Sequence, residues 1–167
     1  MTTIDTILQL LNEDTHIATV LYESPYSANL KIDRKPSPYA IVYLVQSMDI
    51  DVRGSRYFRT LDLEVFFCKP TDLSADGATI QAVCDQMMPM VEDFLHRLQD
   101  TRLFEFDSVK CRQAVGRFDK NVSGLVLELT ISERKPVCFT ELPEPTPEPT
   151  PDTPTEIAET DTLSDLT

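Results

Sequence analysis

The chain has 167 residues and a formal net charge of −13 at neutral pH, from 28 acidic and 15 basic side chains. That balance argues against sequence-independent nucleic-acid binding, which depends on neutralising phosphates with Lys and Arg. No apolar run approaches the ~20 residues that a membrane-spanning helix needs. The N-terminal residues lack the basic region and following apolar stretch of a signal peptide. We therefore expect a soluble, cytoplasmic protein.

The composition changes near residue 140. Residues 1–139 contain 20 acidic and 15 basic side chains, whereas residues 140–167 contain eight acidic side chains, six prolines and no Lys or Arg. A body of this size folds as one domain that buries roughly two-thirds of its unfolded surface. The second stretch has too few apolar residues for a core. We predict an α+β assembly domain over 1–139 and a disordered, acidic Pro/Thr-rich tail over 140–167.

The first predicted helix begins at Thr2 or Thr3, whose hydroxyl can cap its free N–H groups, and ends near Asn12. Its apolar face follows helical spacing and consists of Ile4, Ile7, Leu8 and Leu11. Residues 16–22 are consistent with a short strand. Ser24–Pro25 and the prolines of 35–38 indicate a loop.

Residues 39–45 are β-branched or aromatic on both faces, which predicts a buried central strand. A polar connection over 46–55 follows, with Gly54 available for a positive φ. Residues 57–67 then alternate between apolar and polar side chains as far as Lys69–Pro70. We expect these two strands to form an antiparallel pair.

Residues 74–98 carry the strongest helical periodicity, with a kink or break expected at Pro89 because proline removes a backbone donor. Strands are predicted over 104–115 and 125–131, joined by a turn in which Asn121 and Gly124 supply left-handed backbone conformations. The element order predicts an α+β fold, with an antiparallel sheet covered by two helices.

Motifs of catalysis and cofactor binding are not found. With four glycines and no Gly-rich loop, phosphate cradling is not expected. His16 and His96 have no nucleophile beside them, and the acids around Asp49-Ile-Asp51 lack the ligand spacing of a calcium loop. The four cysteines show no C-x-x-C pair and favour buried thiols over two disulfides. We expect no enzyme, no cofactor and no metal.

A charged segment carries the one positive hypothesis for a site. Its basic residues are Arg53, Arg56 and Arg59, and its acidic residues are Asp49, Asp51, Asp62 and Glu64. Arg is enriched at interfaces because its planar fork pairs with carboxylates at two points. One subunit's arginines can then meet the next subunit's acids, and such head-to-tail contacts close into a ring when the rotation permits. A solvated charged face stays open as the alternative.

The element order resembles that of bacteriophage tail-terminator and head–tail joining (neck) proteins. The segment from Phe118-Asp-Lys-Asn through Ile131 is similar to the turn and last strand of phage or prophage proteins from Bacteroides-type hosts. The resemblance implies a non-enzymatic virion protein that is assembled in the host cytoplasm as a ring, by analogy a hexamer. Its partners would be other copies of itself and neighbouring tail-tube or connector proteins. DNA would pass through the lumen without specific binding.

A different class of function also fits the composition. In that alternative the chain is a soluble adaptor or regulatory module that captures a basic partner through residues 140–167. An enzyme is the third possibility, and it would require Asp62, Glu64 and a histidine to converge in a deep pocket.

Overall fold

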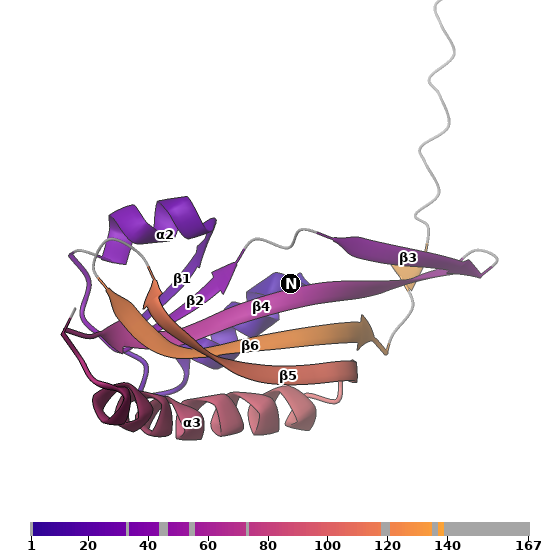
Figure 1. Cartoon of the computed structure of the whole chain (residues 1–167). Coiled ribbons are helices and arrows are strands. Elements are labelled where there is room, and N and C mark those ends of the chain that lie inside the picture. The colour runs from indigo at the N-terminus through magenta and orange to yellow at the C-terminus, as the bar shows by residue number, and fades with distance from the viewer. Residues whose placement is uncertain are drawn as a thin grey trace, which may run out of the picture.

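The protein combines helices with one mixed sheet (Figure 1). The computed structural model describes residues 2–32, 34–43, 47–53, 56–72, 74–117, 121–134 and 137–138. The helices are α1 (Thr3–Asn12), α2 (Pro25–Ile32) and α3 (Gly77–Asp100). The strands are β1 (Thr19–Glu23), β2 (Tyr39–Tyr43), β3 (Met48–Arg53), β4 (Arg56–Pro70), β5 (Phe104–Arg117), β6 (Val122–Glu133) and β7 (Val137–Cys138). The predicted tail, 140–167, lies outside the described residues.

The sheet is organised around the long strand β4. The main strand order is β1-β2-β4-β6-β5, with β3 and β7 also paired to β4. Neighbouring strands are antiparallel except β1 and β2, which run parallel because α2 forms a crossover between them. The predicted combination of helices with a largely antiparallel sheet is confirmed, but one strand pair is parallel and a third helix is present.

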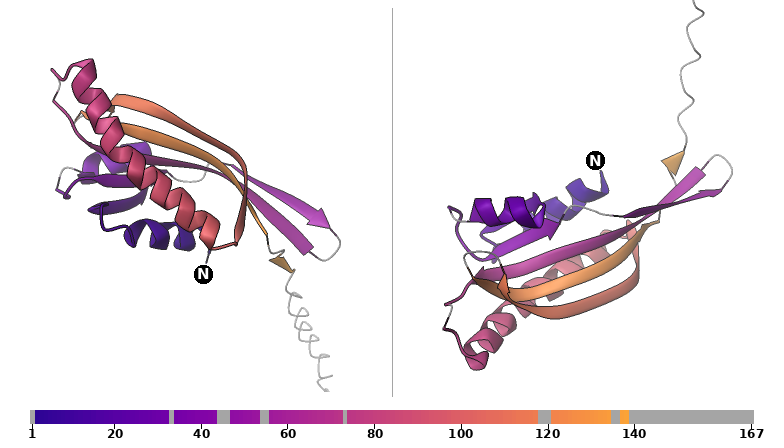
Figure 2. Two further views of the ribbon diagram at one scale, coloured as in Figure 1. Left: turned by 90° about the horizontal axis from the view of Figure 1, so that it is seen from below. Right: turned by 45° about the horizontal axis from the view of Figure 1, so that its top comes forward.

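The two faces of the sheet differ in their cover. Leu61, Leu63 and Val65 of β4 point toward α1 and α3, which lie on one face and enclose the larger core (Figure 2). We call this the helix face. The opposite face, which we call the open face, has a smaller core where Phe66 packs with residues of α2. The rest of the open face carries polar side chains.

Local signals explain where α1 and α3 begin. Thr2 caps α1 in a capping box, since Asp5 N donates to Thr2 Oγ1 at 3.2 Å and Thr2 N donates to Asp5 Oδ2 at 2.8 Å. Asp76 caps α3 by accepting from Thr79 N at 2.8 Å. The helix continues through Pro89, so of the two outcomes expected there, a kink or a break, the break does not occur. Pro89 and Asp85, whose carbonyl loses its helical donor, both lie on the exposed side of α3.

Two segments predicted as loops are regular elements. Pro25 occupies the first position of α2, where a proline is favourable, and Ser24 Oγ accepts from Ser27 N at 3.2 Å. Residues 48–53, predicted within a polar connection, form β3 and pair with β4 along six positions. The prediction of a turn at Asn121 is confirmed by its φ of 54°.

Gly124 does not belong to the turn, and that prediction is wrong. It lies in β6 opposite Cys68 and Ala114, between two neighbouring strands. A Cβ at this position would lie 2.0 Å from the carbonyl oxygen of Phe67 and 2.8 Å from the Cα of Cys68. Glycine is needed here because the backbones of β4 and β6 approach closely.

The end of β4 that carries Arg56–Arg59 extends beyond the body of the sheet together with β3 (Figures 1 and 2). We call β3 and residues 56–59 the arm. Strand β7 pairs with the opposite edge of β4 at Arg56 and Tyr57. The arm therefore continues the sheet as a narrow ribbon that consists of β3, the end of β4 and, beside it, β7.

The close approach at Gly124 yields a stability prediction. We expect Gly124→Ala to lower the free energy of unfolding by about 3 kcal/mol, at the upper end of overpacking costs, because the new methyl group meets backbone. Gly77→Ala is the control, since a Cβ there has no neighbour within 4 Å and alanine favours a helix. Urea unfolding of both variants measures the difference. Equal stability of the two would contradict the packing described here.

Candidate functional site

The structure divides the seven residues of the charged segment among three places. Asp49, Asp51, Arg53 and Arg56 lie on the arm. Arg59 lies at the root of the arm, where it meets the body. Asp62 and Glu64 lie farther along β4 on the open face. They do not form one cluster, and each place has its own chemistry.

The arm has an apolar side and a charged side. Met48, Ile50 and Val52 follow the helix-face side of β3, with 46%, 56% and 56% of each residue's surface exposed. Asp49 and Asp51 alternate with them and are exposed on the open-face side. Strand geometry produces this separation, because successive side chains point to opposite faces. The arm thus presents an apolar stripe backed by acidic side chains.

A partly buried ion pair lies at the root of the arm. Arg59 Nε and Nη2 donate to the two carboxylate oxygens of Glu133 at 2.9 and 2.6 Å. Thr3 Oγ1 at the start of α1 also donates to Glu133. The side chains of Arg59 and Glu133 are 30% and 11% exposed. The hydrogen bond to Glu133 raises the pKa of Arg59 above its usual range. This two-point geometry ties together the arm, β6 and α1.

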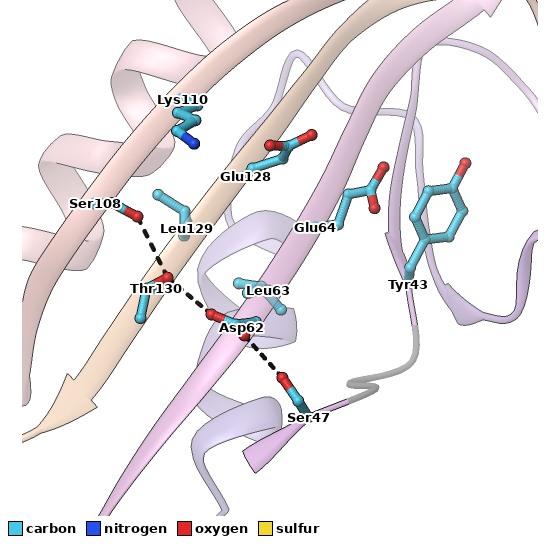
Figure 3. Close-up of a pocket in the computed structure, with 10 residues that line it drawn as sticks. All are labelled: Tyr43, Ser47, Asp62, Leu63, Glu64, Ser108, Lys110, Glu128, Leu129 and Thr130. Carbon is cyan, nitrogen blue, oxygen red and sulfur yellow. Dashed lines mark hydrogen bonds between the residues drawn. The ribbon is translucent and has the colours of Figure 1, made fainter. Parts of the chain in front are cut away.

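The open face contains a shallow hollow of about 340 Å³ (Figure 3). Asp62 lies near its centre and accepts hydrogen bonds from Ser47 Oγ and Thr130 Oγ1, each at 2.8 Å. Both hydrogen bonds lower the pKa of Asp62, so this carboxyl is ionised at neutral pH. The hydroxyl of Ser108 donates in turn to Thr130 at 3.3 Å. The result is a hydrogen-bonded polar row across three strands.

Beside this row, two like charges oppose each other. Glu64 and Glu128 occupy directly paired positions of β4 and β6. Arg112 of β5 lies between them, with its Nε 2.5 Å from Glu128 and its Nη2 3.3 Å from Glu64. Like charges directly opposite each other in a sheet are destabilising, and the guanidinium offsets that repulsion. Glu64 therefore takes part in an ion pair within the chain.

The polar groups around the hollow are mostly engaged within the chain. The side chains that line the hollow include no histidine or cysteine among the described residues, and the carboxylates already accept hydrogen bonds. Burial, followed by the charges of Cys68 and Glu64, raises the pKa of Tyr43 to about 12, so its phenol stays protonated at neutral pH. Within the described ranges, no group of three or more His, Cys, Asp or Glu side chains is arranged to hold a metal ion.

The histidines and thiols lie elsewhere. His16 contacts Asp14 at the end of α1, with its Nδ1 3.1 Å from Asp14 Oδ1, and His96 is exposed on α3. Cys68 and Cys84 are buried thiols as expected, but Cys111 is exposed on β5, which corrects the prediction for that residue. Burial raises the pKa of Cys68, and desolvation also raises that of Cys111. Neither thiol is activated as a nucleophile.

Sequence reasoning missed Glu133 and Thr3 of the root, and Lys110 and Glu128 of the hollow. The alternating pattern Met48-Asp-Ile-Asp-Val-Arg53 is a strand signal that would have located β3. By contrast, Thr3 and Glu133 are 130 positions apart, and no local sequence pattern predicts their contact.

The sequence matches no model of a protein family and no curated protein. Among the described residues, no helix combines the length and apolar character required to cross a bilayer.

The arm root yields a second prediction. We expect Arg59→Ala to cost about 2 kcal/mol of unfolding free energy, because the mostly buried Glu133 carboxylate loses its charged donor. Hydrogen exchange of the β3 amides should accelerate in the same variant. Arg56→Ala, on the exposed part of the arm, should change stability by less than about 0.5 kcal/mol. An Arg59 variant as stable as the Arg56 variant would show that the ion pair does not hold the root.

A third prediction concerns the opposed glutamates. Removing the guanidinium in Arg112→Ala should destabilise the protein by about 0.5–1 kcal/mol at neutral pH and low salt. Adding Glu64→Gln should recover most of the loss, since it removes one of the two like charges. Thermal unfolding of the single and double variants measures this. A double variant no more stable than Arg112→Ala would rule out repulsion as the cause.

Proposed function

We propose that this protein is a non-enzymatic structural subunit that assembles with copies of itself into a ring at the neck or tail end of a bacteriophage. The observation that carries the proposal is the arm, which extends beyond the body of the sheet (Figure 2) and carries three exposed apolar residues, Met48, Ile50 and Val52. The resemblance in element order to tail-terminator and head–tail joining proteins supports the location in the virion. By the same analogy the ring is a hexamer.

An arm of this composition favours a protein partner. Exposed apolar residues gathered in a line mark interaction sites more often than residues scattered singly. The unpaired edge of β3 is also a template for another strand. The ion pair at the root holds the arm in one position, which reduces the ordering cost of a contact.

The charge distribution fits a neck component. The body has a net charge of −5 over residues 1–139, and a ring with acidic walls repels the phosphates of DNA that passes through its lumen. Tail-tube or connector proteins would be the neighbours of such a ring. In this proposal the predicted disordered tail, 140–167, is an extended tether, because proline-rich segments behave as stiff spacers.

The alternative function depends on the same tail. Its eight acidic and no basic side chains suit electrostatic capture of a basic partner by a soluble adaptor. Assembly through the arm and capture through the tail involve different residues, so one experiment separates the two functions.

The test measures mass in solution across a range of concentrations, for the full chain and for a chain truncated after Phe139. We expect a discrete ring-sized species in both. Replacing Met48, Ile50 and Val52 by serine should abolish it. The matched control replaces Tyr26 and Leu30 of α2, which are 76% and 63% exposed, and should leave it intact.

A monomer in all forms at high concentration would overturn self-assembly as the function. Binding of a basic protein only by the full-length monomer would then favour the adaptor. Loss of the ring in the α2 control but not in the arm variant would assign assembly to α2.

A further inference from the structure

Strands β3 and β5 lie at opposite edges of the sheet, and β1 is a further edge strand, paired with β2 alone among the described residues. Among the described residues, β3 pairs with β4 alone and β5 pairs with β6 alone. The register between β5 and β6 is interrupted at residues 106–108 and 114–117 and is regular from Ser108 to Ala114. Irregularities of this kind hinder the pairing of another strand with an edge strand. A further strand can therefore pair with the regular part of β5. That part spans seven residues, and β3 has six.

The outward backbone groups of β5 follow from one hydrogen bond. In an antiparallel ladder, alternate residues direct their N–H and C=O groups to alternate sides. Arg134 N, directly after β6, donates to Leu103 O at 2.9 Å. The backbone N–H and C=O groups of even-numbered residues at this end of β6 therefore point toward β5. The regular β4–β6 register carries this alternation along β6. The backbone groups that point away from β6 therefore belong to Val109, Cys111 and Gln113.

The same alternation continues across the sheet to β3. The backbone N–H and C=O groups of the odd-numbered residues of β6 point to β4, where their partners are also odd-numbered. The backbone groups of the even-numbered residues of β4 therefore point the other way, to β3. Phe58 and Thr60 are paired with Asp51 and Asp49. The backbone groups that point away from β4 consequently belong to Met48, Ile50 and Val52.

The side chains on the two edges are complementary on both faces of the sheet. On the helix-face side, the apolar stripe of β3 would meet Val109, which is 45% exposed, and the exposed Cys111. On the open-face side, the acidic Asp49 and Asp51 would meet the basic Lys110 and Arg112, whose guanidinium also contacts Glu64 and Glu128 of its own chain.

Strand directions allow this contact between copies in the same orientation. Strand β3 is antiparallel to β4, and β5 is parallel to β4 because two antiparallel pairings separate them. A neighbouring copy placed beside the sheet without inversion brings its β3 antiparallel to β5, with the helix faces on the same side. Such a contact is head to tail, the type that generates rings.

We infer that β3 of one copy adds to the free edge of β5 of the next, with Val52 opposite Val109 and Ile50 opposite Cys111. This inference deepens the proposed function and depends on self-assembly. In this register the hydrogen-bonded pairs consist of residues whose backbone N–H and C=O groups point outward on both strands. The intervening pairs are Asp51 with Lys110 and Asp49 with Arg112. These are the non-hydrogen-bonded positions, where side chains lie closest.

The exposed Cys111 provides a native probe of this register. In the variant Ile50→Cys, the new thiol would lie opposite Cys111 of the next copy, about 5.5 Å away between Cα atoms, within the range of a disulfide. Within one chain the two positions lie about 14 Å apart across the strands alone. They are further offset along β4, because Ile50 pairs with Arg59 whereas Cys111 connects through Leu127 to Val65, so an internal bond is excluded. The background carries Cys138→Ser so that this cysteine contributes no cross-link.

Mild oxidation of full-length Ile50→Cys at assembling concentration should give a ladder of cross-linked multimers under non-reducing conditions. Asp51→Cys is the matched control, because its side chain points to the opposite face. We expect its yield to be lower by on the order of tenfold. Adding Cys111→Ser to the Ile50 variant should abolish the ladder.

A charge exchange supplies an independent measurement. Asp51→Lys and Lys110→Asp should each weaken association, by about fivefold at low salt, and the double variant should restore it.

The outcomes separate this inference from the proposed function. A ring-sized species whose Ile50→Cys variant does not cross-link to Cys111 overturns the strand pairing and leaves self-assembly standing. Equal yields for the Ile50 and Asp51 variants also overturn it, because they would indicate random collision. If neither the parent chain nor any variant assembles, both proposals fail.

Discussion

The pairing of β4 is the constraint on which the rest of the structure depends. This strand of 15 residues pairs with β2 and β3 along one edge and with β6 and β7 along the other. One of its faces supplies the larger core through Leu61, Leu63 and Val65, while the other carries Asp62 and Glu64. Because the arm and the body share one continuous backbone, the position of the arm follows from the packing of the core. The ion pair between Arg59 and Glu133 lies where the covered part of β4 ends.

The open face shows how a polar sheet surface is kept stable without a covering layer. Asp62 is held by two hydroxyl groups, and the repulsion between Glu64 and Glu128 is offset by Arg112. Glu64, Glu128 and Arg112 are thus paired within the chain. The role of two acidic residues close together in a sequence therefore depends on which side chains lie beside them in the fold. On this strand they belong to a network of hydrogen bonds and ion pairs across β4, β5 and β6.

Periodic patterns predicted the long elements of this fold, and local ambiguity produced the errors. The long elements α3, β4 and β6 were predicted because apolar residues recur at helical spacing in α3 and at alternate positions in β4 and β6. Ser24–Pro25 serves equally as a loop signal and as a helix start, and only the crossover from β1 to β2 decides for α2. A glycine such as Gly124 suits a turn or a close approach of strands, and the partner strand settles which. The contact between Arg59 and Glu133 joins residues 74 positions apart and has no sequence signature.

The acidic side chains of β3 also determine which contacts the arm avoids. Two arms that met edge to edge about a two-fold axis would bring Asp49 and Asp51 of both copies onto the same face of one ribbon, where like charges repel. Two β5 edges that met in the same way would place Lys110 and Arg112 together. The charges on each edge thus oppose symmetric pairing of identical edges. An isolated molecule with two reactive edges would otherwise be prone to form closed dimers, and that side reaction would remove subunits from any larger assembly.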